Sequence, residues 1–184
     1  SMRTGDRSLE IVQFLERMRF KEPKLVAFDL AGAESGFPPS MHAAALSLAR
    51  TKLLNLTLHA SEAPDIELIE DALGQGAHRI GHGVRLQSGM LRTPNGQAIL
   101  GQVARFVYDH RIHLEMAPSC HVQIGAVPDI ESHPIADFLR LGFSVGVNTD
   151  NRLMSGVSLS SELLLTATTF DLSWEQMAQL VLHA

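Results

Sequence analysis

The stretch Asn55-Leu56-Thr57-Leu58-His59-Ala60-Ser61-Glu62 decides the fold of this chain. An apolar strand runs into a histidine, and a glutamate follows three residues later. Side chains three apart in an extended strand point to opposite faces of the sheet. His59 and Glu62 can therefore serve one site only if the strand ends at His59 and Glu62 lies on the loop beyond it. Catalytic groups collect at this place, the carboxyl ends of the strands, in barrels of parallel strands.

Other short apolar runs also end in polar residues. Residues 80–83 read Ile-Gly-His-Gly, and residues 147–151 read Val-Asn-Thr-Asp-Asn. The sequence predicts strand ends, 23 to 34 residues apart, at Asp29, His59, His82, Met116 and Asn148. That interval is the length of a strand–loop–helix unit, and strands that alternate with helices form a parallel sheet. We therefore expect an α/β fold with about five such units.

Helical patterns fill the segments between the predicted strands. The hydrophobic spacing and the Pro, Gly and Ser signals predict helices over residues 9–18, 38–52, 97–109, 134–141, 159–169 and 173–183, and one from Pro64-Asp65 to about Gly74. Ser173, three residues before Gln176, predicts a capping box for the last helix. No linker divides the chain, so residues 1–184 are expected to form a single domain. Ser1-Met2 is interpreted as a vector remnant outside the fold.

Composition excludes several classes of function. Hydrophobic residues make up 45% of the 184 residues and the net charge is −5, so no basic stripe exists to bind nucleic acid. No apolar run approaches the roughly 20 residues of a membrane span. The single cysteine, Cys120, rules out an intramolecular disulfide and suits a reducing compartment. We expect a cytoplasmic protein with no nucleic-acid or membrane partner.

Five polar residues converge if the strands are parallel neighbours: His59, Glu62, His82, Asp150 and Asn151. Imidazole and carboxylate are zinc ligands, and a catalytic zinc usually keeps three protein ligands and a water. His59 and Asp150 are candidate ligands. A second histidine can then orient the hydroxide that zinc makes available, while a glutamate carries a proton to the leaving side.

Each of these residues also has a structural interpretation. A lone histidine at a strand end is more often a satisfied structural residue than a ligand. Asp150 can cap the following turn, and Glu62 can be a first-turn acid of the helix that begins at Pro64. Gly81 and Gly83 can simply permit an unusual backbone. The joint appearance of these residues at successive strand ends favours a functional site.

The motifs together resemble the metal-dependent adenosine deaminases, and most closely a bacterial branch of that family. The resemblance rests on His-Ala-Ser-Glu at 59–62, Gly-His-Gly-Val at 81–84 and Asn-Thr-Asp-Asn at 148–151. Further support comes from residues 29–34, 122–128, 131–134 and 151–156. It extends in unbroken order from about Val26 to Glu162.

This resemblance implies a zinc (β/α)₈ barrel of the TIM type that hydrolyses adenosine to inosine and ammonia. By resemblance, His59 and Asp150 bind the metal, and Asp150 also helps to activate the water. Glu62 matches the proton donor to the purine ring nitrogen, and His82 matches the residue that positions the attacking hydroxide. The single cysteine excludes the cysteine-ligated nucleobase deaminases, which need paired cysteines.

The substrate contacts implied by the resemblance are less complete. Gly32 matches a backbone contact to the purine, and Asn151 lies where a second acid commonly touches the base. Ser61 stands where the family usually has glycine. The segment 117–121 also departs from the family pattern, and His121 is interpreted as a surface or loop-packing residue. The other histidines are interpreted as structural: His42, His78, His110, His113, His133 and His183.

One family feature is absent from the 184 residues. The family's first strand carries a His-x-His pair that provides two further zinc ligands, and no such pair occurs here. We therefore expect a fragment that covers roughly barrel strands four to eight, binds zinc weakly and is inactive alone. Five strands cannot close an eight-stranded barrel, so the strands at 25–28 and 143–147 are expected to leave open edges for self-association. Two alternatives stay open: a deaminase of another aminopurine, and a non-catalytic half-barrel that binds a nucleoside or a partner chain.

Overall fold

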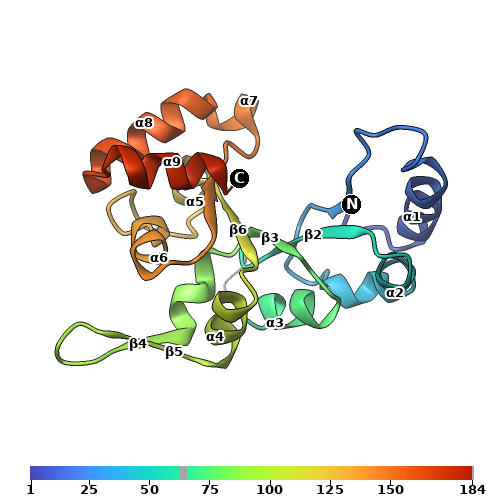
Figure 1. Ribbon diagram of the computed structural model, residues 1–184, viewed down its shortest axis with the longest axis horizontal. Helices are drawn as coiled ribbons and strands as arrows, with labels where there is room; N and C mark the ends of the chain where they lie inside the picture. The colour runs from blue at the N-terminus through green and yellow to red at the C-terminus, as the bar shows by residue number, and fades with distance from the viewer. Residues whose placement is uncertain (63–65, 184) are drawn as a thin grey trace. The chain divides into compact units, whose positions relative to one another are not determined.

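The computed structural model describes residues 1–62 and 66–183 and has an α/β architecture (Figure 1). Its main sheet has five strands in the order β1-β2-β3-β6-β7. These strands are β1 (Ala27–Leu30), β2 (Asn55–Ala60), β3 (Arg79–His82), β6 (His113–Met116) and β7 (Val145–Val147). Each ends within one residue of the position that the sequence predicts, which confirms the alternation of strands and helices. The outermost strands in this order are β1 and β7, as expected.

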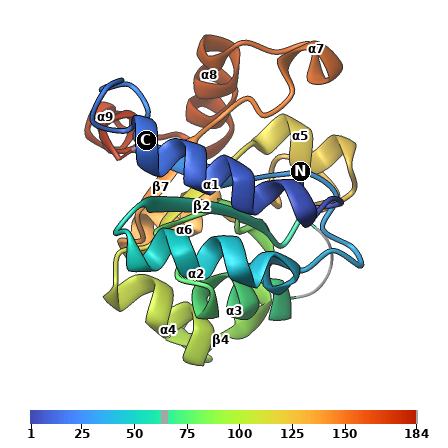
Figure 2. The ribbon, with the colours of Figure 1, turned by 90° about the vertical axis from the view of Figure 1, so that its right-hand side faces the viewer.

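The chain divides into two compact units, Ser1–Gly81 and His82–Ala184. The first unit contains α1 (Asp6–Met18), the 3₁₀ helix η1 (Pro39–His42), α2 (Ala43–Thr51) and α3 (Glu67–Gly74). Strands β1 and β2 pair in parallel, with Ala27 opposite Asn55 and Leu30 opposite Leu58. Helix α1 packs against α2 (Figure 2). The predicted start of α3 at Pro64-Asp65 lies outside the described residues.

Met2 belongs to the core of the first unit, so its exclusion from the fold is wrong. Its side chain is fully buried, and its backbone N–H donates to the Ala31 carbonyl oxygen at 3.0 Å. The Met2 carbonyl oxygen lies 3.0 Å from Nε2 of buried His42, whose Nδ1 lies 2.7 Å from the Ser8 hydroxyl. These contacts tie the amino-terminal residues to α1 and η1.

The second unit carries the remaining elements. Its helices are the 3₁₀ helix η2 (Val84–Gly89), α4 (Gln102–Asp109), α5 (Pro118–Gln123), α6 (Ile135–Leu141), α7 (Arg152–Ser155), α8 (Leu159–Phe170) and α9 (Trp174–Leu182). Strands β4 (Met90–Arg92) and β5 (Ala98–Leu100) form a separate antiparallel hairpin. Helices α6, α8 and α9 contact β7. Among the described residues, none of the helices combines the length and the apolar character needed to cross a membrane.

The structure confirms one predicted terminus in each of two helices, and the predicted start of a third helix is wrong. Gly142, at φ 88°, ends α6 as predicted, and Ser173 and Gln176 form the predicted capping box of α9. The helix predicted from residue 97 begins only at Gln102, because residues 98–100 form β5. The Gln97 N–H donates to the Thr93 hydroxyl at 3.0 Å, which closes the hairpin turn before β5. Helix α5 was not predicted.

Candidate functional site

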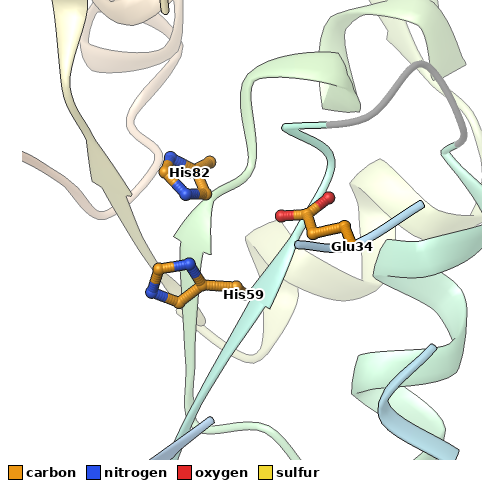
Figure 3. Close-up of side chains that lie close together, drawn as sticks. All are labelled: Glu34, His59 and His82. Atoms are coloured by element: carbon orange, nitrogen blue, oxygen red, sulfur yellow. The ribbon is translucent and has the colours of Figure 1, made fainter. Parts of the chain in front are cut away.

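His59 lies at the carboxyl end of β2 among carboxylates. Its Nε2 is 3.9 Å from Oδ1 of Asp29 on β1. A carboxylate oxygen of Glu34, a buried residue on the loop after β1, lies within 4.8 Å of a His59 ring nitrogen. Figure 3 shows these two side chains, together with His82, at which β3 ends. The negative surroundings of this imidazole suit a bound cation.

Gly81 leaves room for the His59 ring. A Cβ at Gly81 would lie 2.5 Å from Cδ2 of His59 and 3.0 Å from its Nε2, closer than van der Waals contact allows. Gly81 therefore serves close packing, not an unusual backbone. At Gly83 both reasons apply, since its φ is +70° and a Cβ there would lie 2.7 Å from Cδ2 of Leu114.

Ser61 and Glu62 follow β2 directly. The strand ends at Ala60, so Glu62 lies on the loop beyond it, as the sequence predicts, and is half-buried. Ser61 is fully buried and has φ 76°, in the left-handed region where glycine is favoured. This backbone gives a physical reason why glycine would be favoured here. The serine keeps the turn at a cost in strain.

Gly32 lies on the loop after β1, with φ +130°. A Cβ at this position would approach the Ser1 Oγ to 3.4 Å and the Met2 backbone nitrogen to 3.5 Å. A side chain here would be strained by the backbone, although its Cβ would make only ordinary van der Waals contacts with the amino-terminal residues. Gly32 therefore exposes bare backbone on the same loop as Glu34.

His82 begins the site in the second unit. It is buried, has φ 72°, and its Nδ1 lies 3.0 Å from Nε2 of His121. The two rings meet edge to face, with centroids 5.2 Å apart. His121 lies on α5 and is 0% exposed, so its interpretation as a surface residue is wrong. The burial of His121 was missed because α5 was not predicted, and it is this helix that places the His121 side chain in the interior.

His133 extends this cluster, although its place there was not predicted and it was interpreted only as a structural histidine. Its Nε2 lies 2.8 Å from Nδ1 of His121, and the two rings are stacked with their planes 6° apart. The backbone N–H of Ile135 donates to Nδ1 of His133 at 3.2 Å. Burial lowers the pKa of His133 to about 3. Burial is the main reason that the pKa of His121 lies well below its usual value, and the nearby His133, His82 and Arg85 lower this pKa further.

Asp150 and Asn151 follow β7. Asp150 is exposed, has φ 49°, and its Oδ2 accepts a hydrogen bond from the Cys120 thiol at 3.0 Å. The Asn151 side-chain oxygen accepts from the Met154 N–H at 3.3 Å and caps α7. The capping role considered for Asp150 thus belongs to Asn151.

Helix α5 connects these parts of the second unit through three consecutive residues. The Ser119 N–H donates to Oε2 of buried Glu162 on α8 at 3.0 Å, and its hydroxyl donates to the other carboxylate oxygen. Cys120 bonds Asp150, and His121 bonds His82. One short helix therefore fixes residues from β3, α8 and the loop after β7.

Each unit brings together part of the predicted site. The first holds Gly32, His59 and Glu62 at or beyond the ends of β1 and β2. The second holds His82, Asp150 and Asn151 at or beyond the ends of β3 and β7. His82 and Asp150 both have positive φ, a strained conformation that clusters at functional sites. Imidazoles and carboxylates at or beyond the carboxyl ends of these strands lie where the active sites of TIM-barrel enzymes form.

Comparison with protein families identifies the family within that class. The family model for adenosine deaminase matches residues 2–184. The adenosine deaminase of Mycobacterium sp. (strain KMS) is 42% identical over 185 residues, and that of Mycobacterium marinum is 40% identical. Each match covers 100% of this chain and 51% of the relative. The chain belongs to the adenosine deaminase family of hydrolases and spans about half the length of the curated relatives that it matches.

Solved structures support the same fold. Adenine deaminase from Arthrobacter aurescens superposes with a TM-score of 0.80 at 24% identity, over 98% of this chain and 51% of the other. The N6-methyl-AMP deaminase of Arabidopsis thaliana gives a TM-score of 0.78 at 24% identity, over 96% and 48%. An amidohydrolase from Burkhoderia ambifaria with bound Zn gives 0.75 at 21% identity, over 97% and 47%. The five strands and their helices thus correspond to about half of a TIM barrel.

Proposed function

We propose that this chain forms part of a zinc-dependent barrel that hydrolyses adenosine to inosine and ammonia. The observation that carries the proposal is the placement of His59, Glu62, His82 and Asp150 at or just beyond the ends of β2, β3 and β7. The relatives that are about 40% identical bear the name adenosine deaminase, which favours a purine nucleoside as substrate.

His59 and Asp150 would hold the metal. Both offer donor atoms that zinc prefers, and the carboxylates of Asp29 and Glu34 surround His59 with negative charge. When bound, zinc supplies hydroxide near neutral pH. A solved amidohydrolase of the same fold carries bound Zn, which favours zinc as the metal.

The remaining residues handle the proton and the substrate. Glu62, on the loop after β2, would donate a proton to the purine ring nitrogen, which relieves the negative charge that develops there during attack. His82 would orient the attacking oxygen. The backbone at Gly32 would contact the purine, and the Asn151 amide would meet the base while its oxygen caps α7.

This chain by itself is proposed to be inactive. Two ligands bind zinc weakly, and the 184 residues contain no His-x-His pair. The test is ammonia release from adenosine with added zinc, for the chain alone and mixed with the amino-terminal half of a mycobacterial adenosine deaminase. We expect activity only in the mixture, abolished by Glu62→Ala. Activity of the chain alone, abolished by Glu62→Ala, would overturn the proposed inactivity.

A second candidate is the deamination of another aminopurine. Ser61 stands where the family usually has glycine, and the Asn151 oxygen is already engaged by α7. Both differences lie where the base would bind. A screen of adenine, adenosine and N6-methylated substrates with the mixed halves separates the two candidates.

A third candidate is a half-barrel that binds a nucleoside or a partner chain without turnover. Equilibrium dialysis with zinc and adenosine tests it.

Self-association is proposed through the outermost strands. β1 and β7 lie at the two ends of the strand order, and an edge strand presents backbone groups to a second chain. Light scattering on the purified chain is expected to give a dimer, and a compact monomer would contradict this.

The lone cysteine suits a reducing compartment, so the cytoplasm is the proposed location. Fractionation of a tagged protein tests it.

A further inference from the structure

Three buried histidines from separate segments of the second unit form a hydrogen-bonded chain. His82 ends β3, His121 lies on α5, and His133 precedes α6. The ring nitrogens lie 3.0 Å apart between His82 and His121 and 2.8 Å apart between His121 and His133. All three are at most 4% exposed. The chain ends at the backbone N–H of Ile135, which donates to Nδ1 of His133.

The Ile135 amide sets the direction of the whole chain. A backbone N–H can only donate, so Nδ1 of His133 must carry a lone pair. A neutral imidazole has one N–H and one lone pair, so the His133 proton is on Nε2, facing Nδ1 of His121. The same rule places the His121 proton on Nε2, facing Nδ1 of His82. The neutral His82 ring then carries its proton on Nε2.

We propose that His121 and His133 are positioning residues that fix His82 in its Nε2–H tautomer. For its catalytic meaning this rests on the proposed function, because only there does His82 meet the attacking oxygen. In this tautomer His82 offers that oxygen a hydrogen-bond donor. A neutral His82 cannot accept a proton at Nε2, so it orients the nucleophile as a donor and does not act as its base.

Burial supports a neutral state of His121 and His133. Charging His121 would place its second N–H against the N–H of His133, and charging His133 would place one against the Ile135 amide. The lowered pKa values of both rings agree with neutral imidazoles at pH 7.

A purely structural role is the alternative. The Ile135 amide opens α6, and the first amides of a helix need an outside acceptor. His133 would then only cap α6, and His121 would only fill the core. Under that alternative the tautomer of His82 would not depend on His133.

Histidine nitrogen NMR on the full chain distinguishes the two roles, because ring couplings report which nitrogen carries the proton. At pH 7 we expect the Nε2–H tautomer at His82, His121 and His133. His133→Phe keeps a stacked ring but removes the donor, and should leave His121 and His82 in mixed tautomers. His133→Gln keeps an amide donor and should restore the wild-type pattern. A wild-type His82 in the Nδ1–H form, or a His82 tautomer unchanged by His133→Phe, would overturn the proposal.

Activity of the mixed halves gives a second readout. His133→Phe is expected to lower kcat for adenosine about tenfold with little change in KM, and His133→Gln to recover most of it. Equal kcat values in wild type and His133→Phe would contradict the positioning role. If no sample deaminates adenosine, the proposed function fails, whereas the NMR result still decides the tautomer. Melting curves of each variant establish that it is folded.

Discussion

The imidazole of His59 lies against the backbone of Gly81, so closely that a Cβ at position 81 would come within 2.5 Å of Cδ2. Gly81→Ala must therefore move the ring or the strand. Overpacking of this kind costs about 1–3 kcal/mol of the free energy of unfolding. Urea denaturation of the full chain measures the loss.

A double-mutant cycle assigns that loss to the ring. In a His59→Ala background the alanine at position 81 meets no imidazole, so Gly81→Ala should cost much less there. Distant, independent substitutions add to within about 0.5 kcal/mol. Additive effects of Gly81→Ala and His59→Ala would contradict the contact.

Ser61 is expected to carry backbone strain. Its φ of 76° is costly for any residue with a Cβ, by about 1–2 kcal/mol. Ser61→Gly removes the Cβ and the hydroxyl, whereas Ser61→Ala removes the hydroxyl alone. The glycine variant should therefore be more stable than the alanine variant by about 1 kcal/mol in thermal or urea unfolding. Equal stability of the two variants would show that position 61 is relaxed.

The sequence predicted the strand ends well, because hydrophobic runs and the following polar residues mark them locally. It placed His59 and His82 at the ends of β2 and β3 and put Glu62 on the loop after β2. It missed α5, whose six residues begin with Pro118 and carry no apolar period. With α5 missed, the inward direction of His121 and its contact with His133, 12 residues away, could not be foreseen. Such contacts depend on tertiary packing and leave no local signal.

Glu162 on α8 should be important for the stability of α5. Its buried carboxylate accepts from both the N–H and the hydroxyl of Ser119. Glu162→Gln keeps one acceptor for the Ser119 N–H but replaces the other oxygen with an amide donor, so the hydroxyl must turn to accept. Both hydrogen bonds then lose the charge, which should cost about 2 kcal/mol in unfolding free energy. Ser119→Ala removes one of the two bonds and should cost less. The double variant, with both Glu162→Gln and Ser119→Ala, should be no less stable than Glu162→Gln alone. Fully additive losses of stability would contradict the interaction between Ser119 and Glu162.

Stability is expected to fall in acid because of His133. Its pKa is about 3 in the folded chain against an ordinary 6.5, so between these values the unfolded chain binds a proton that the folded chain does not. Stability from this group is complete above pH 6.5 and declines as the pH falls toward 3, with a slope of about 1.4 kcal/mol per pH unit. Urea unfolding from pH 7 to pH 4 measures the slope. His133→Gln removes this one proton and should therefore reduce the slope by about 1.4 kcal/mol per pH unit. The same slope in the variant and the wild type would contradict burial of a neutral His133 ring.

Zinc titration of the full chain, followed through the ring signals of His59, tests whether His59 and Asp150 share one metal. Asp150→Asn is the matched variant, because its side-chain oxygen can still accept from the Cys120 thiol while the charge is lost. We predict weak, saturable zinc binding at His59 in the wild type and a zinc affinity at least about tenfold lower in Asp150→Asn. The same zinc affinity at His59 in both proteins would mean that Asp150 is no ligand of that metal.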